Sequence, residues 1–358
     1  MSKFFTSRLY RLTPYVPGEQ PKDVKYIKLN TNESPYPPSE SVIAAATASA
    51  KTLALYSDPE CKRLTEKAAE VFGVSADRVI MTNGSDEVIN FAFMAFSDER
   101  RPVVFPDITY GFYPVFAELS RIPYRTIPLA SDLSIRVEDY IGIGENIVIA
   151  NPNAPTGLAL PLSDIERIVA SNPDNVVIID EAYVDFGGES AIPLTEKYDN
   201  LLVTGTFSKS RSMAGARLGF GIGNPSLIAD LNTIKYSTNP YNVNAMTQAT
   251  GLAALEDNDY YMANCRKIVE TREYTMAALR ALGFEVTDSK ANFVFAKSGE
   301  ISGGELYKRL RERGILVRHF NGERISEYNR ITIGTREDME TLVATVGEIL
   351  ADKKGLLK

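Results

Sequence analysis

Short apolar runs recur between residues 78 and 222, and they predict the strands of a buried sheet. The runs are Arg78–Thr82, Val103–Phe105, Tyr124–Ile127, Asn146–Ala150, Val176–Ile179, Leu201–Thr204 and Gly219–Ile222. Helical or turn segments separate most of them, and the runs recur at intervals of roughly 25–30 residues. Strands that alternate with helices are typical of an α/β sheet that is mostly parallel and covered on both faces.

The segments on either side of this region have different patterns. Residues 1–40 are rich in Pro, Asn and Tyr without strong periodicity, which predicts an extended arm. Helical patterns follow over 41–55 and 60–72, the second ended by Gly73. Beyond Gly251 a long charged helix is expected over 257–282. Short strands and helices follow it: strands at 284–287, 292–296, 315–317 and 330–333, and helices at 304–313 and from 336 to about 350.

These changes of pattern predict three parts. An arm, 1–40, would pack with the small domain; 41–255 would form a large domain; and 256–358 would form a small α+β domain. A chain of 358 residues favours about two domains and can bury a large core without disulfides or a structural metal.

Composition and charge exclude several classes of function. The net charge, 39 − 46 = −7, gives no electrostatic reason to bind nucleic acid or an anionic membrane. Two distant cysteines and one histidine leave no set of zinc ligands, so no metal site is expected. Low cysteine usage, a start unlike a secretory signal and the lack of a long apolar run together favour the cytoplasm.

Four polar clusters carry the candidate chemistry, and each follows a predicted strand. They are Asn83–Glu87, Asn151–Gly157, Asp180–Tyr183 and Thr206–Lys209, the last with Arg217 eight residues beyond Lys209. Any one of them alone is usually a helix cap, a turn or a surface pair. Four in succession at strand ends are hard to explain by capping. Open α/β sheets bind ligands just outside the carboxyl ends of their strands, so a shared site is expected.

At this point the chain resembles the fold-type I aminotransferases that use pyridoxal 5′-phosphate (PLP), and within them the histidinol-phosphate aminotransferase family. Beyond the four clusters, the resemblance rests on motifs that span nearly the whole chain: Leu12–Gly18, Lys28–Pro35, Tyr56–Pro59, Thr109–Tyr110 and Arg330–Arg336. It implies a large domain with a mostly parallel central sheet and a small α+β domain. It also implies a homodimer that converts histidinol phosphate and 2-oxoglutarate to imidazole-acetol phosphate and glutamate, in histidine biosynthesis.

The resemblance assigns roles around PLP. Lys209 would supply the amine for a Schiff base and, once released, a general base. Asp180 would keep the pyridine nitrogen protonated, and Tyr183 would reach the phenolic oxygen. The phosphate would be held by backbone N–H groups at a helix start and by hydroxyl and guanidinium donors. The residues around the phosphate and the ring would be Gly84, Ser85, Asp86, Thr206, Ser208 and Arg217, with Tyr110 covering the ring and Tyr56 reaching the neighbouring subunit's phosphate.

Substrate roles also come from the resemblance. Arg330 would hold an α-carboxylate, and Arg318 with Tyr15 would hold the distal phosphate or carboxylate. The chain departs from the family in two places. Ala154 stands where most relatives have an Asn that contacts the phenolic oxygen, so either Asn153 takes that role or Tyr183 acts alone. The stretch 18–26, where the arm would cover the substrate, is shorter than in many members.

Other functions compete with this interpretation. An aromatic amino-acid aminotransferase and an enzyme similar to threonine-phosphate decarboxylase would share most of these motifs. A binding protein that has lost its chemistry is disfavoured by Lys209, Asp180 and Arg217. A nicotinamide dehydrogenase is disfavoured because no G-x-G-x-x-G follows a strand.

Overall fold

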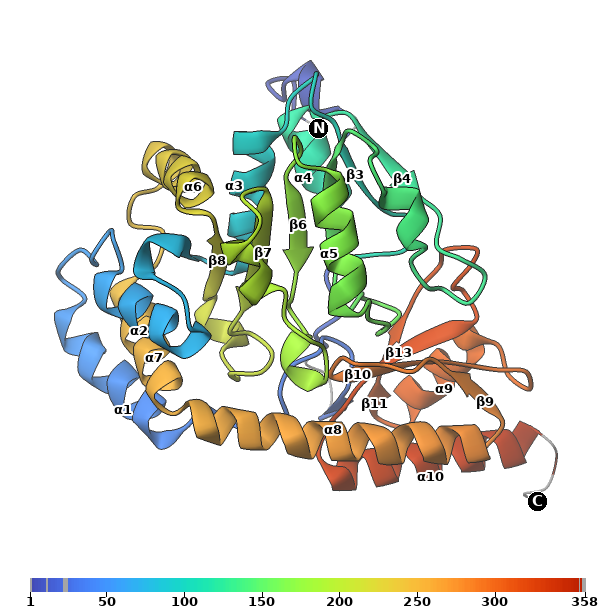
Figure 1. Ribbon diagram of the computed structural model, residues 1–358. Coiled ribbons are helices and arrows are strands. Elements are labelled where there is room, and N and C mark those ends of the chain that lie inside the picture. Colours follow the sequence, from blue (N-terminus) through green and yellow to red (C-terminus); the bar gives the residue numbers. More distant parts are fainter. Residues whose placement is uncertain (1, 11, 22–24, 354, 356–358) are drawn as a thin grey trace.

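The centre of the protein is a seven-stranded sheet (Figure 1). The computed structural model describes residues 2–10, 12–21, 25–353 and 355. The strand order is β2 (Val79–Thr82), β8 (Gly219–Gly223), β7 (Leu201–Thr206), β6 (Val177–Asp180), β5 (Asn146–Ala150), β3 (Val103–Pro106) and β4 (Tyr124–Ile127). Only β8 runs against its neighbours, so the expected mostly parallel α/β sheet is confirmed.

Both faces of this sheet are covered by helices. On β5, Ile147 and Ile149 belong to one buried cluster and Val148 to another. The first cluster includes residues of α2 (Lys62–Phe72), α5 (Leu162–Ser171) and α7 (Ala245–Glu256). The second includes residues of α3 (Ser85–Phe96), α4 (Tyr113–Ser120) and α6 (Pro225–Thr238). Because side chains on both faces are buried, these strands appear in the sequence as continuous apolar runs.

The C-terminal part is a separate layer of strands and helices. Its antiparallel sheet has the order β12 (Arg318–His319), β13 (Tyr328–Thr332), β10 (Phe293–Ser298) and β9 (Phe284–Val286). The helices are α8 (Asn258–Ala281), α9 (Gly303–Glu312) and α10 (Arg336–Lys353). The predicted long helix is confirmed as α8, which runs along the underside of the molecule toward the small sheet (Figure 1).

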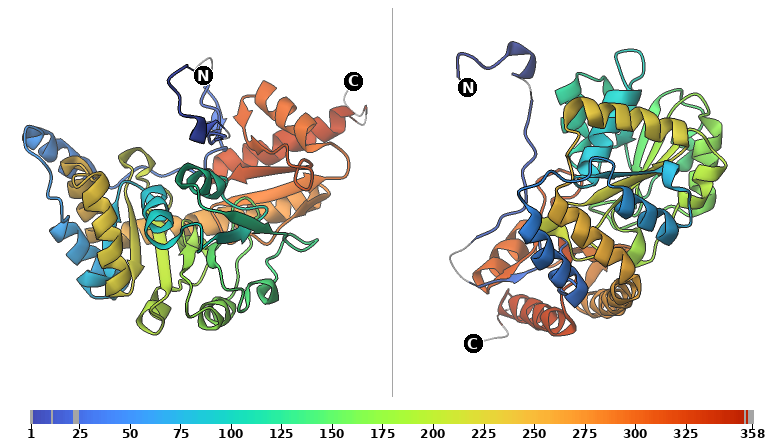
Figure 2. Two further views of the ribbon diagram at one scale, coloured as in Figure 1. Left: turned by 90° about the horizontal axis from the view of Figure 1, so that it is seen from above. Right: turned by 90° about the vertical axis from the view of Figure 1, so that its left-hand side faces the viewer.

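The N-terminal arm joins this C-terminal part. Its strand β1 (Ile27–Lys28) pairs in parallel with β11 (Ile315–Leu316), and Leu29 is buried in the C-terminal core. α1 (Glu40–Ser49) then leads into the large part. Residues 2–10 project away from the body of the chain (Figure 2). The domain limits at 40 and 255 stay a prediction. Within the described ranges, no helix is both long and apolar enough to cross a membrane.

Candidate active site

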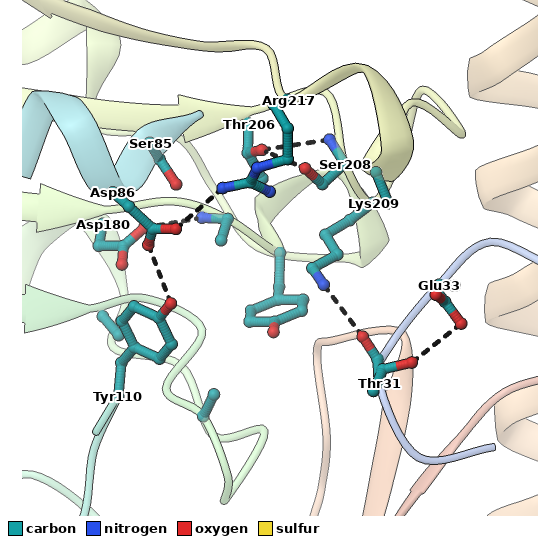
Figure 3. A pocket seen from close by; sticks show the side chains of 15 residues that line it. Thr31, Glu33, Ser85, Asp86, Tyr110, Asp180, Thr206, Ser208, Lys209 and Arg217 are labelled. Carbon is teal, nitrogen blue, oxygen red and sulfur yellow. Dashed lines mark hydrogen bonds and ion pairs between the residues drawn. The ribbon is translucent and has the colours of Figure 1, made fainter. Parts of the chain in front are cut away.

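The four polar clusters meet around one cavity of about 170 Å³ at the carboxyl ends of the central strands (Figure 3). A second cavity of about 550 Å³ adjoins it and shares Thr31, Tyr110, Ala154, Tyr183 and Lys209 with it. We call the first the inner cavity and the second the outer cavity. The inner one is lined by Thr31, Glu33, Ser85, Asp86, Tyr110, Ala150, Ala154, Asp180, Ala182, Tyr183, Thr206, Ser208, Lys209, Ala214 and Arg217.

Lys209 extends into the inner cavity three residues after the end of β7 (Figure 3). Its Nζ donates a hydrogen bond to the backbone oxygen of Thr31, 3.2 Å away. Desolvation by the surrounding protein, followed by repulsion from Arg330, lowers the pKa of Lys209 to about 8. A fraction of the amine is therefore neutral near pH 7, as a nucleophile requires.

Asp180 ends β6 on another wall of the inner cavity. Its Oδ2 accepts a hydrogen bond from the Tyr113 hydroxyl at 2.8 Å, and its Oδ1 accepts one from the N–H of Ala182 at 3.3 Å. Burial raises the pKa of Asp180 to about 6. Tyr113 was missed in the sequence; the signal was a second tyrosine three residues after Tyr110.

Several hydrogen-bond donors gather around the start of α3. Gly84 has a φ of +81°, a conformation that favours glycine, and a Cβ there would lie 2.7 Å from Arg217 Nη2 and displace the guanidinium. Ser85 begins the helix, whose free N–H groups attract negative charge. Across the cavity, the Thr206 and Ser208 hydroxyls lie 3.0 Å apart. Hydroxyl, amide and guanidinium donors together suit a phosphate group.

Asp86 links the arginine to an aromatic wall. Its Oδ2 lies 3.0 Å from Arg217 Nη2, and its Oδ1 accepts a hydrogen bond from the Tyr110 hydroxyl at 2.9 Å. Burial raises the pKa of Tyr110, so the phenol stays protonated and remains a donor. Asp86 therefore orients both the guanidinium and the ring.

The structure does not bring the Asn153 side chain into the inner cavity. Its Oδ1 accepts a hydrogen bond from Thr109 at 2.8 Å, and its Nδ2 donates to Ile108 O at 3.0 Å and Thr156 Oγ1 at 3.1 Å. Two of these contacts tie the loop to the segment after β3, and the third holds the loop itself. The neighbouring Ala154 lines the cavity instead and offers no side-chain donor.

Positive charge is concentrated in the outer cavity. Arg330 donates to Asn30 O at 3.0 Å and lies 5.4 Å from the Phe293 ring, while its Nε is a buried donor for which the described residues offer no acceptor. Such an orphaned donor is unusual and favours an anionic ligand. Arg318 donates to the backbone oxygens of Val16 and Pro17, at 3.2 and 3.4 Å.

The remaining two predicted residues, Tyr15 and Tyr56, lie in different places. Tyr15 lines the outer cavity, with its ring 4.9 Å from that of Phe112. Tyr56 lines neither cavity. Its side chain is 85% exposed, with its ring stacked on Tyr241 at 4.6 Å.

This combination of fold and site defines an aminotransferase. The family model described as "Aminotransferase class I and II" matches residues 24–346, and the chain belongs to that family. A relative from Aromatoleum aromaticum, named histidinol-phosphate aminotransferase, is 50% identical over 98% of this chain and 100% of its own. One from Brachyspira hyodysenteriae with the same name is 48% identical over 98% and 99%.

The solved structures agree with the fold. The histidinol-phosphate aminotransferase of Sinorhizobium meliloti, in complex with pyridoxal-5′-phosphate, is 23% identical and superimposes with a TM-score of 0.89, covering 98% of this chain and 99% of that one. The fold-type I architecture expected from the motifs is thereby confirmed.

Glu181, next to Asp180, is buried but does not line the inner cavity, and its ionisation should affect the stability of the fold. Its carboxylate accepts hydrogen bonds from Ser190 and the N–H of Ala191, both at 2.6 Å, and burial raises its pKa to about 8. The folded state therefore binds a proton more tightly than the unfolded chain. Stability from this group is full below about pH 4.5 and declines as the pH rises to about 8.

Glu181→Gln imitates the protonated carboxyl, so the gap between variant and wild type should widen with pH. We expect nearly equal stability at pH 5 and a variant more stable by roughly 3 kcal/mol at pH 8. Urea unfolding at the two pH values measures this. Glu189→Gln, on an exposed neighbour, is the control. A variant that is less stable at both pH values would contradict the assignment.

Proposed function

We propose that this protein is a PLP-dependent aminotransferase whose substrates are histidinol phosphate and 2-oxoglutarate. One observation carries the proposal: a desolvated lysine amine lies in a cavity bounded by a buried carboxylate and by an anion-binding helix start. The names of relatives that match this chain over its full length support the substrate pair.

The donors of the inner cavity fit PLP. When bound, PLP supplies a carbonyl carbon that combines with amines and a ring that withdraws electrons. Lys209 provides the amine and afterwards takes or gives the proton at the substrate carbon. Asp180, in its low-dielectric position, holds a proton on the ring nitrogen, and Tyr183 donates to the phenolic oxygen. Gly84, Ser85, Asp86, Thr206, Ser208 and Arg217 form the phosphate site, and Tyr110 covers the ring.

The proposal assigns no PLP contact to Asn153, because its amide is already occupied by Thr109, Ile108 and Thr156. Tyr183 is then left as the side-chain donor to the phenolic oxygen in this part of the site, with Ala154 beside it.

The outer cavity fits two substrates of different shape. Histidinol phosphate has no α-carboxylate, whereas glutamate has two carboxylates. In the proposal, Arg330 binds the α-carboxylate of glutamate through its buried guanidinium. Arg318, with Tyr15, binds the phosphate of histidinol phosphate and the second carboxylate of glutamate. Arg318 would exchange its two backbone acceptors in the arm for these anions, to which its hydrogen bonds are stronger.

We also propose a homodimer in the cytoplasm. Leu53, Leu55, Tyr56 and Tyr241 are exposed apolar side chains, and surfaces of this kind favour a protein partner. In the dimer, Tyr56 would reach the PLP phosphate of the neighbouring subunit. Both cysteines are buried and unpaired, as is typical of a reducing compartment.

The first test of the function is the cofactor linkage. The wild-type protein should be yellow with PLP, and borohydride should fix the cofactor on Lys209, as found by peptide mass spectrometry. Lys209→Ala should lose the linkage and nearly all turnover, at least about a thousandfold, because both nucleophile and base are removed. Lys197→Ala, on the surface, is the control. Turnover in Lys209→Ala similar to that of wild type would refute the proposal.

The second test separates the two substrates. Arg330→Ala removes a desolvated charged contact, worth roughly 1.5–3 kcal/mol, or about ten- to a hundredfold. Stopped-flow absorbance should show the glutamate half-reaction slowed by that factor and the histidinol-phosphate half-reaction affected much less. Arg318→Ala should slow the histidinol-phosphate half-reaction. Equal slowing of both half-reactions in Arg330→Ala would mean that Arg330 contacts the cofactor or has a structural role only.

A further inference from the structure

Asn32 occupies a buried junction between the arm, the C-terminal sheet and the outer cavity, which it lines. It is 1% exposed and has a φ of +58°, a conformation that Asn tolerates better than most residues. Its backbone N–H donates to Thr332 Oγ1 at 2.9 Å, and its backbone oxygen accepts from Asn292 Nδ2 at 3.0 Å. The backbone is therefore fixed independently of the Asn32 side chain.

The side-chain amide of Asn32 makes two further hydrogen bonds. Its Oδ1 accepts from the Thr332 hydroxyl at 3.0 Å, and its Nδ2 donates to the Tyr183 hydroxyl at 2.9 Å. The Thr332 hydroxyl oxygen accepts a hydrogen bond from the Asn32 N–H. The proton of the same hydroxyl points elsewhere and needs an acceptor of its own. With the amide turned over, Nδ2 would face Thr332 and leave that proton without an acceptor among these groups. The network therefore selects the orientation with Nδ2 toward Tyr183.

This orientation decides what the Tyr183 hydroxyl can do. The hydroxyl has one proton to donate. Asn32 Nδ2 is a donor only and cannot accept that proton. The proton is therefore left for a group in the two adjoining cavities, both of which Tyr183 lines. Ala154, on the same cavity wall, offers no side-chain donor that could share this task.

We propose that Asn32 is a positioning residue: it accepts nothing from Tyr183, and so it directs the tyrosine proton to the phenolic oxygen of the cofactor. The inference rests on the proposed PLP function and deepens it. In a chain with alanine at position 154, the hydrogen bond to that oxygen depends on a single tyrosine, and the direction of its proton matters correspondingly more.

The expected consequence is a shift in the pKa of the Schiff-base nitrogen. The phenolic oxygen of PLP would accept the tyrosine hydrogen bond more strongly when the Schiff-base nitrogen is deprotonated, because the oxygen then shares no proton with that nitrogen. A donor there favours the deprotonated Schiff base and lowers its pKa. Misdirecting the donor should raise that pKa, which is read from the pH dependence of the cofactor absorbance in the holoenzyme.

The test is a double-mutant cycle of Asn32→Gly and Tyr183→Phe. Glycine adopts the positive φ and keeps both backbone hydrogen bonds, so only the amide is lost. Asn32→Gly should raise the Schiff-base pKa by about half a unit or more, roughly threefold in the protonation equilibrium. In the Tyr183→Phe background the same change should shift it by less than about 0.2 units, since the tyrosine is absent.

Two further variants keep the test decisive. Thr332→Val removes the hydroxyl that orients the amide, together with the acceptor of the Asn32 N–H, and should raise the pKa in the same direction, again only when Tyr183 is present. Asn292→Ala loosens the Asn32 carbonyl without touching the amide, and should lower the melting temperature while leaving the pKa unchanged.

An unchanged pKa in Asn32→Gly and Thr332→Val, or an equal rise in the Tyr183→Phe background, would overturn the inference. The proposed function would fail differently, because the wild-type protein itself would then show no pH-dependent PLP absorbance.

Discussion

Desolvation of the Lys209 amine is the constraint on which the rest of the site depends. A lysine at the end of a parallel strand would ordinarily extend into water and stay charged. Here the arm closes over it, with Thr31 O as its hydrogen-bond acceptor, and its pKa falls to about 8. The arm can do so because β1 is paired with β11 and Leu29 is buried in the C-terminal core.

The same arrangement separates charges by their place in the fold. The central sheet contributes the buried carboxylate of Asp180, and α3, which follows β2, contributes its N-terminus. The C-terminal sheet contributes Arg318 on β12 and Arg330 on β13, on the side where the substrate would enter. Each part alone would hold only some of the side chains that the proposed reaction needs. The arm, packed against both, positions Thr31 and Asn32 where the halves meet.

Much of this architecture could be predicted from the sequence, for identifiable reasons. Strands buried on both faces give continuous apolar runs, so β5 and β6 were found almost residue for residue. Polar clusters after such strands must gather at one edge, which brought Ser85, Asp180 and Lys209 together. Side-chain directions were not predictable, because they depend on partners distant in the sequence. Asn153 bonds Thr109 on the segment after β3, Tyr113 supports Asp180 from α4, and Asn32 contacts Tyr183 across 151 positions.

The central claim is that Lys209 and its neighbours move an amino group from histidinol phosphate. A single-turnover experiment without any 2-oxo acid tests it most directly: PLP-loaded protein is mixed with excess histidinol phosphate, and cofactor and product are quantified by mass spectrometry. The account predicts that nearly every site yields pyridoxamine phosphate and one equivalent of imidazole-acetol phosphate. Unchanged PLP with histidinol phosphate, together with conversion by phenylalanine or carbon dioxide release from threonine phosphate, would contradict it.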